Sequence, residues 1–236
     1  MAAIELYSTP LFGDSNLIHY YRFEGNSNDS KGSTNGTDVS VSYSASYGFF
    51  GQGVYFNGSA RIYFSGHVTS SNSPFSVSFW MKSATTGLST IFADGIAWDG
   101  DNAGVYLWLG DSSGKPFFQL RNGVSNGQSN LQSTTNVYNG NWHHVVLTCT
   151  GDTSSNGQKV YVDGSLNAQM TPNFNVANPS GSNYYLGSGR SDSNVYNYTG
   201  YLDDLAFFSR VLTPTEVNNL YTGNWPKGGI FFHNYL

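Results

Sequence analysis

Charged side chains, and glutamate in particular, are scarce in this 236-residue sequence. Charged residues make up 11% of the chain, and its three glutamates are Glu5, Glu24 and Glu216. A typical globular chain carries about 25% charged residues. Hydrolysis of a glycosidic bond usually needs two carboxylates that face each other across it. Only Glu24 lies in strand-like sequence, and most aspartates fall in turn sequences. The scarcity of paired carboxylates therefore favours a binding function over catalysis. A glycosidase is a lower-ranked alternative.

Four further absences limit the functions and locations that the chain can have. The net charge is −5 and the ten lysines and arginines are scattered singly, which argues against a nucleic-acid partner. No apolar run approaches the roughly 20 residues of a membrane span, so membrane insertion is not expected. No signal peptide is visible at the N-terminus, and we expect an extracellular or virion-surface location reached by another route or after signal removal. Cys149 is the only cysteine, which excludes an intrachain disulfide and predicts a buried, inert thiol.

The chain is rich in aromatic residues, which make up 16% of it, and in glycine, of which it has 28. Short alternating or aromatic-rich segments recur between Gly, Asn, Asp and Ser clusters, which predicts an all-β sandwich or barrel with antiparallel strands. The expected strands are His19–Phe23, Val54–Phe56, Arg61–Phe64, Phe75–Lys82, Thr90–Ala93, Val105–Leu109, Phe117–Arg121, His143–Thr148, Lys159–Val162, Tyr184–Leu186 and Tyr201–Phe208.

One short C-terminal helix is expected. Thr213 and Glu216 have capping-box spacing, with Pro214 at the first helical position, and Gly223 marks the end. We interpret this helix as structural. Residues 1–16 are interpreted as a leader, residues 17–223 as one domain, and residues 224–236 as an aromatic tail that packs on the domain or on a partner chain.

Several short motifs follow one another in a fixed order along the chain. They are His19–Glu24, Asn28–Gly32, Gly53–Gly58, Phe75–Lys82, Asn141–Val146, Val160–Gly164, Gly200–Leu205 and Ser209–Thr213. This ordered set resembles the laminin-G-like branch of the concanavalin A-like lectin/glucanase superfamily, from roughly Leu17 to Tyr221. The resemblance implies a jelly-roll sandwich of two curved antiparallel sheets. It implies no hydrolase, because the Glu-x-Asp-x-x-Glu strand of the laminarinase relatives is missing. One departure is Asn57, where the branch usually has aspartate.

The resemblance also implies a structural Ca²⁺ ion held by Asp29 and Asp203. Calcium takes six to eight oxygen ligands, many of them backbone carbonyls. Strand parity places Asp203 on one face with Leu205 and Phe207, which are apolar, and a carboxylate in such a row needs a partner. That partner is Ca²⁺, Arg22, or backbone amides of the opposing turn. Asp204 would then point the other way, to solvent.

A second candidate site takes carbohydrate or a glycoconjugate. Trp98 stands beside Asp99, Asp101 and Asn102, and sugars need an aromatic ring for stacking and polar groups for their hydroxyls. Trp108 shares one strand face with Tyr106 and would add a second ring. The alternative is a plain turn with a core tryptophan. A second Ca²⁺ at Asp99 and Asp101 is a lesser alternative, because the EF-hand pattern lacks its twelfth-position glutamate.

The segment Trp142-His143-His144 is interpreted as structural, because adjacent strand residues point to opposite faces and cannot readily chelate one metal. We therefore expect a non-catalytic, lectin-like adhesion or display module, possible also on a virion. The alternative is a purely structural phage or viral particle protein whose termini contact neighbouring subunits.

Overall fold

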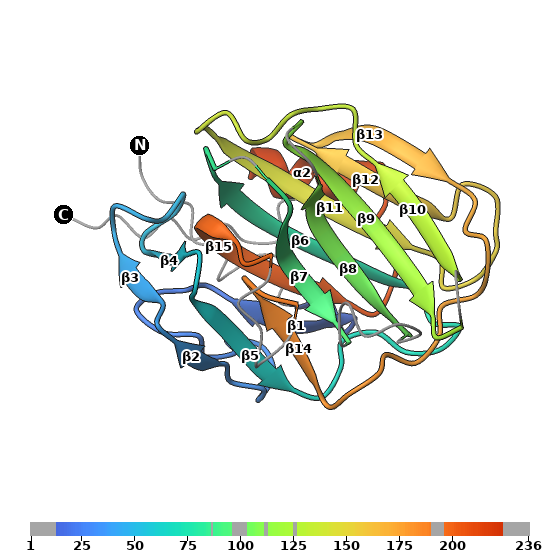
Figure 1. Ribbon diagram of the computed structural model, residues 1–236, viewed down its shortest axis with the longest axis horizontal. Helices are drawn as coiled ribbons and strands as arrows, with labels where there is room; N and C mark the ends of the chain where they lie inside the picture. The colour runs from blue at the N-terminus through green and yellow to red at the C-terminus, as the bar shows by residue number, and fades with distance from the viewer. Residues whose placement is uncertain are drawn as a thin grey trace.

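The computed structural model describes residues 13–85, 87–95, 103–110, 113–124, 127–189 and 196–223. In this part of the chain the strands form two stacked sheets, visible one behind the other in Figure 1, and all pairings between named strands are antiparallel. The eight-stranded sheet has the order β13 (Ser165–Met170), β12 (Gln158–Val162), β11 (Trp142–Cys149), β6 (Phe75–Lys82), β15 (Thr199–Phe208), β4 (Gly53–Asn57), β3 (Ser42–Ser44), with β1 (Leu17–Tyr21) also paired to β15.

The seven-stranded sheet has the order β10 (Gln128–Gln132), β9 (Lys115–Asn122), β8 (Ala103–Gly110), β7 (Ser89–Asp94), β14 (Asn183–Leu186), β5 (Arg61–Ser65), β2 (Thr37–Val39). Alternate residues of both sheets meet in one apolar core, which includes Phe56, Phe79 and Leu107. This is the arrangement of a sandwich, in which the inner faces interdigitate and the outer faces stay available.

The predicted strands are all present, with ends shifted by a few residues, and the structure adds four that the sequence did not predict. These are β2, β3, β10 and β13, and each is the terminal strand of its sheet. An edge strand packs against one neighbour and has fewer core positions to fill, so its sequence carries a weaker alternation of apolar residues.

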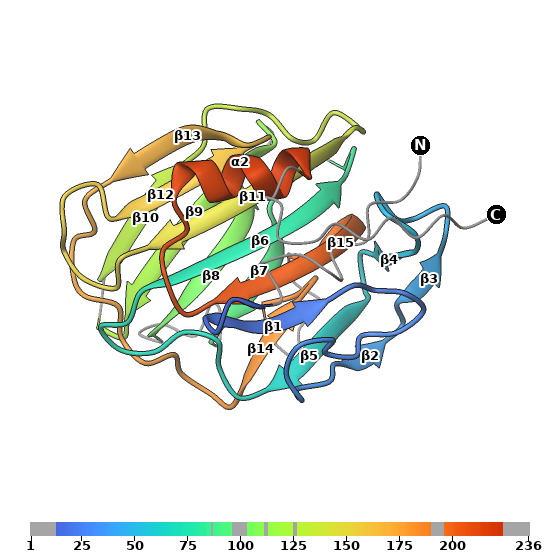
Figure 2. The ribbon, with the colours of Figure 1, turned by 180° about the vertical axis from the view of Figure 1, so that it is seen from behind.

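The predicted helix is α2 (Pro214–Thr222), and its caps are as expected. The Thr213 side chain accepts a hydrogen bond from the Glu216 N–H, Glu216 accepts one from the Thr213 N–H, and Gly223 is left-handed at φ 69°. Figure 2 shows α2 lying across the outer face of the eight-stranded sheet, over β11 and β12. Val217 and Leu220 of the helix pack there in a cluster separate from the main core. No helix among the described residues is long and apolar enough to cross a membrane.

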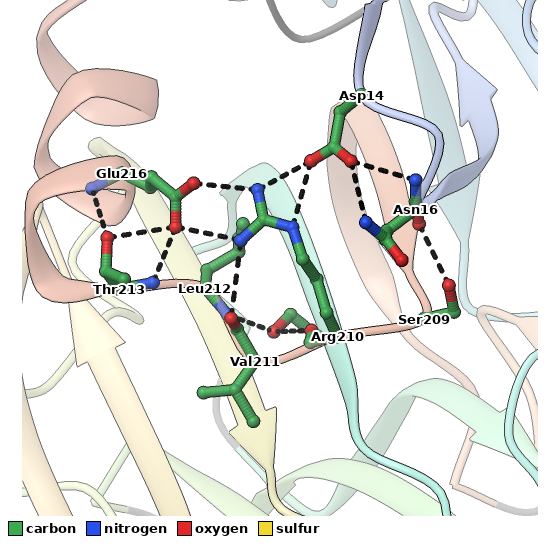
Figure 3. Close-up of polar contacts among 9 residues, drawn as sticks. Asp14, Asn16, Ser209, Arg210, Val211, Leu212, Thr213 and Glu216 are labelled. Atoms are coloured by element: carbon green, nitrogen blue, oxygen red, sulfur yellow. Dashed lines mark hydrogen bonds and ion pairs between the residues drawn. The ribbon is translucent and has the colours of Figure 1, made fainter.

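Arg210 ties the start of the described chain to this helix (Figure 3). Its guanidinium donates to the Asp14 carboxylate at 2.5 and 3.0 Å and to both oxygens of Glu216 at 2.9 and 2.7 Å. The two carboxylates raise the pKa of Arg210, and Arg210 in turn lowers the pKa of Glu216. The loop after β15 therefore holds both the N-terminal segment and the first turn of α2.

Candidate functional site

Most of the predicted carbohydrate site lies outside the described residues. Trp98, Asp99, Asp101 and Asn102 belong to this group. Trp108 is described, and it lies on the outer face of the seven-stranded sheet in a cluster with Ala93 and Tyr106. The side chain is 4% exposed, so in this structure its ring does not offer a face to a ligand in solvent.

Asp29 has a dense set of hydrogen-bond donors around its buried carboxylate. Oδ1 accepts the backbone N–H groups of Tyr20, Lys31 and Gly32 at 2.9 to 3.1 Å, and Oδ2 accepts the N–H of Thr34 and lies 2.6 Å from His19 Nδ1. Burial opposes ionisation, but the bonds from His19 and from the backbone outweigh it and lower the pKa of Asp29 to about 2.

Asp203 is fully buried and faces away from the main core. A β-bulge between Asp203 and Ala206 shifts the register of β15 against β6, so that Asp203 pairs with Trp80 while Leu202 pairs with the core residue Met81. Cross-strand partners share a face. The expected row of Asp203 with Leu205 and Phe207 is therefore wrong, because a bulge inserts one residue and reverses the alternation beyond it.

Backbone amides are the partner of Asp203. Its Oδ2 accepts the N–H groups of Phe49 and Phe50, both at 2.8 Å, and its Oδ1 accepts that of Asp204 at 2.9 Å. The neighbouring Asp204, at φ 48° in the bulge, accepts the Tyr20 hydroxyl at 2.5 Å. The expectation that Asp204 is simply solvated is therefore wrong. Burial raises the pKa of both carboxyl groups.

The hydrogen bonds of Asp29 and Asp203 compete with the predicted binding of Ca²⁺. The carboxylate oxygens of Asp29 and Asp203 already accept N–H groups, which would have to give way to a cation. Among the described residues no group of three His, Cys, Asp or Glu could hold a metal. The two residues as arranged here do not fit a calcium centre, and the calcium assignment stays a prediction.

A continuous row of half-buried side chains crosses the outer face of the eight-stranded sheet. Residues of β4, β15, β6 and β11 lie opposite one another in register, and the row is Tyr55, Tyr201, Lys82, Trp142. Ring centroids are 5.1 Å apart for Tyr55 and Tyr201 and 6.4 Å apart for Tyr201 and Trp142. Amphipathic aromatic rings that are part buried and part wet are typical of binding surfaces.

The turn of residues 47–52 adds two more rings. Tyr47 lies 5.2 Å from Tyr201, and Phe49, 39% exposed, lies 5.9 Å from Trp142. Phe49 also stacks on Trp80 at 3.6 Å. We call Tyr47, Phe49, Tyr55, Trp142 and Tyr201 the aromatic surface.

Two carboxylates, the buried Asp203 and the partly exposed Glu24, accept hydrogen bonds from this turn. Asp203 binds two of its N–H groups, as described above, and Glu24 Oε2 accepts the N–H of Gln52 at 3.1 Å. Gly51 has φ 57°, and a Cβ there would collide with the Glu24 carboxylate. The turn is thus fixed by its own sequence, and the rings it carries are placed before any ligand arrives.

In the segment Trp142-His143-His144 the two histidines make structural contacts, and Trp142 lies on the outer face of the sheet. His143 Nδ1 lies 2.8 Å from Asp163, and the buried His144 places Nε2 2.9 Å from the Ser78 hydroxyl. Burial lowers the pKa of His144 to about 3. Trp142, however, contacts Phe49 and Tyr201 in the aromatic surface, and the sequence did not predict these contacts.

The seven-stranded sheet carries a different surface near its β10 edge. Three amide side chains bond to one another there, with Gln119 Nε2 donating to Gln128 Oε1 at 3.1 Å and to Asn130 Oδ1 at 3.0 Å. Phe117, half-buried, is the cross-strand partner of Trp108. The side chains of this amide group form hydrogen bonds with one another, whereas the aromatic surface consists of partly exposed rings.

Comparison with known proteins settles the family. Residues 55–218 match the family described as the concanavalin A-like lectin/glucanases superfamily. The chain belongs to this superfamily. No curated protein matches the sequence.

Solved structures with the same fold include binding domains of larger proteins. Domain 4 of AbnA, a GH43 extracellular arabinanase from Geobacillus stearothermophilus solved in complex with arabinotriose, is 24% identical with a TM-score of 0.70, and the match covers 87% of this chain and 98% of that one. The binding domain of Paraclostridial Mosquitocidal Protein 1 is 16% identical with a TM-score of 0.67, over 90% of this chain and 53% of that one.

The binding domain of Botulinum Neurotoxin DC, solved in complex with SialylT, is 15% identical with a TM-score of 0.67, over 90% of this chain and 52% of that one. This superfamily member thus spans about half the length of the toxin binding domains. These likenesses concern the fold, and they confirm the predicted jelly-roll sandwich of two antiparallel sheets with a short C-terminal helix.

Proposed function

We propose that this chain is a non-catalytic, lectin-like module that binds carbohydrate or a glycoconjugate through its aromatic surface. The observation that carries the proposal is the in-register row in which Tyr55, Tyr201 and Trp142 stay half-buried on three strands of one sheet. A sugar presents an apolar ring face for stacking and hydroxyls for hydrogen bonds, and tyrosine and tryptophan supply both kinds of contact.

The geometry favours a soluble glycan chain over a flat crystalline polysaccharide. Neighbouring rings are tilted, by 35° between Tyr55 and Tyr201 and by 47° between Tyr201 and Trp142. Rings tilted in this way cannot all lie against one plane, but each can meet a separate sugar of a twisted chain. The arabinotriose bound by domain 4 of AbnA and the SialylT bound by the neurotoxin domain are ligands of those proteins, and they support this class of ligand for the same fold.

Catalysis is not part of the proposal, because the described carboxylates next to the aromatic surface are engaged with protein donors. Asp203 binds three N–H groups, Asp204 binds Tyr20, and Glu24 binds Gln52. A retaining glycosidase needs two carboxyl groups about 5 Å apart around an accessible bond. Release of reducing ends from β-glucans by the purified protein would overturn the non-catalytic part.

A glycan array followed by calorimetric titration of the best ligand tests the binding part. Removal of one stacking ring is expected to raise Kd by about 2- to 13-fold, from roughly 0.5–1.5 kcal/mol per aromatic contact. The variants are Trp142→Ala and Tyr201→Ala, and the control is Gln119→Ala on the other sheet. An array without any ligand, or a loss confined to the Gln119 variant, would contradict the assignment to this surface.

A location outside the cell or on a virion belongs to the same proposal. The alternative of a purely structural particle protein rests on residues 1–16 and 224–236, most of which lie outside the described residues. Size-exclusion chromatography of chains that lack either segment separates the two, because assembly should depend on those segments only if the structural alternative holds.

A further inference from the structure

One cation lies inside the aromatic surface. Lys82 is the last residue of β6 and stands in register between Tyr201 on β15 and Trp142 on β11. The residue is half-buried. Its side chain therefore lies on the same face as the two rings, and its backbone is one strand spacing, about 4.8 Å, from the strand of each.

Lys82 forms no ion pair or side-chain hydrogen bond within the part of the chain that the structure describes. Other cations differ, because Arg210 is shared between Asp14 and Glu216, and Arg22 lies 3.8 Å from Glu24. A lysine often serves to protect an exposed sheet edge from pairing. That role does not apply to Lys82, because β6 lies between β11 and β15 in the middle of its sheet.

We propose, building on the carbohydrate function above, that the aromatic surface selects glycans with a carboxylated sugar. The sugar ring would stack on Trp142 or Tyr201, and its carboxylate would meet the Lys82 ammonium. Uronic and sialic acids share this chemistry, an apolar ring face with an attached carboxylate. The carboxylate supplies the counter-charge that the protein does not provide at this position.

The overall charge of the chain does not prevent such binding. The net charge of −5 repels an anion at long range, but charges beyond about 8 Å are largely screened at physiological ionic strength. The contact between Lys82 and the carboxylate acts at short range, so it decides selectivity, whereas the net charge slows association. The selectivity should consequently weaken at high salt.

Titration calorimetry with two matched ligand pairs tests the proposal. The pairs are trigalacturonic acid with its carboxyl-reduced, neutral counterpart, and 3′-sialyllactose with lactose. We expect at least one acidic ligand to bind about 2- to 5-fold more tightly than its neutral partner, as for one partly exposed ion pair. The pair that shows the difference identifies a uronic or a sialic acid as the preferred source of the carboxylate.

Three variants test whether Lys82 causes the preference for the acidic ligand. Lys82→Gln should abolish the preference for the acidic ligand, measured as the ratio of the two Kd values of a matched pair, and Lys82→Arg should restore it. Lys159→Gln is the control, because Lys159 lies on β12 of the same sheet and changes the net charge equally. An equal loss in the Lys159 variant, or equal binding of acidic and neutral ligands by the wild type, would overturn the proposal. Neutral binding that still depends on Trp142 would leave the carbohydrate function standing, whereas no binding of any ligand would remove both.

Discussion

Replacement of Asp29 by asparagine is the sharpest test of how the N-terminal part of the fold is held. The pKa of Asp29 is about 2 against an ordinary value of 3.8, and one pKa unit corresponds to about 1.4 kcal/mol. The ionised carboxylate therefore stabilises the folded state by about 2.5 kcal/mol at neutral pH. In Asp29→Asn the amide oxygen can keep the three backbone donors at Oδ1, but the amide nitrogen faces His19 and the Thr34 N–H and accepts from neither.

The pH dependence follows from the direction of the shift. A carboxyl group whose pKa is lowered by folding contributes stability above its unfolded pKa, and the contribution is lost as pH falls through the folded pKa. The difference in free energy of unfolding between wild type and Asp29→Asn should thus be about 2 to 3 kcal/mol near pH 7 and about half of that near pH 3. Urea denaturation at both pH values measures it.

Asp38→Asn is the matched control, because Asp38 is exposed and accepts hydrogen bonds from the hydroxyls of Ser27 and Tyr43. A smaller change is expected there. The reasoning fails if Asp29→Asn lies within about 0.5 kcal/mol of wild type near pH 7, or if the difference does not shrink on acidification. The same samples test the calcium prediction: an excess of Ca²⁺ that raises the wild-type midpoint but not that of Asp29→Asn would favour a metal over the hydrogen-bond account.

Three further variants probe the parts of the structure around the aromatic surface and α2. Asp203→Ala leaves the N–H groups at residues 49, 50 and 204 without their acceptor. The free energy of unfolding should therefore fall by about 2–4 kcal/mol, and the aromatic circular dichroism should change. Unchanged stability would mean that other contacts hold the turn. Arg210→Ala should lower stability by about 1–2 kcal/mol, less at high salt, since its ion pairs are partly exposed; a loss that salt leaves unchanged would contradict an electrostatic origin. Burial raises the pKa of Asp204 to about 6, so protonation favours the folded state and stability should fall as pH rises from about 4 to 6. Burial also raises the pKa of Asp203, so Asp204→Asn should reduce that slope in urea titrations and leave the part that belongs to Asp203; an unchanged slope would contradict the assignment to Asp204.

The central strands could be predicted from the sequence, and the edge strands could not. Segments such as Phe75–Lys82 have core residues at alternate positions, and their pattern is strong because both neighbours and the core constrain them. The four missed strands are the ends of the two sheets. In β10, for example, the sequence Gln-Ser-Asn-Leu-Gln has one apolar residue. The position of the strand is set by pairing with β9 and by hydrogen bonds from the Gln119 side chain of β9 to the side chains of Gln128 and Asn130.

The aromatic surface was missed for a different reason. Alternation alone places Tyr55 opposite to Val54 and Phe56, and Tyr201 opposite to Leu202, so each ring could have been assigned to the outer face. Their meeting depends on the strand order β4, β15, β6, β11, which joins residues up to 146 positions apart. No local pattern contains that order. The family resemblance gave the fold but no residue of this surface.

The bulge in β15 explains two findings. It reverses the expected face of Asp203, and it thereby places the Asp203 carboxylate where it binds the turn of residues 47–52 beside the aromatic surface. Without the inserted residue, strand parity would turn Asp203 toward the core, and the turn of residues 47–52 would lose two of its anchors. With it, Asp204 takes a positive φ and two adjacent carboxyl groups are buried, and both features oppose folding. In return, Phe49 has a fixed position in the aromatic surface, where it stacks on Trp80. A strained element with two carboxyl groups beside these rings fits the proposed ligand, which would need the rings already in place, and it is the reason to test the proposed glycan site here rather than on the opposite sheet.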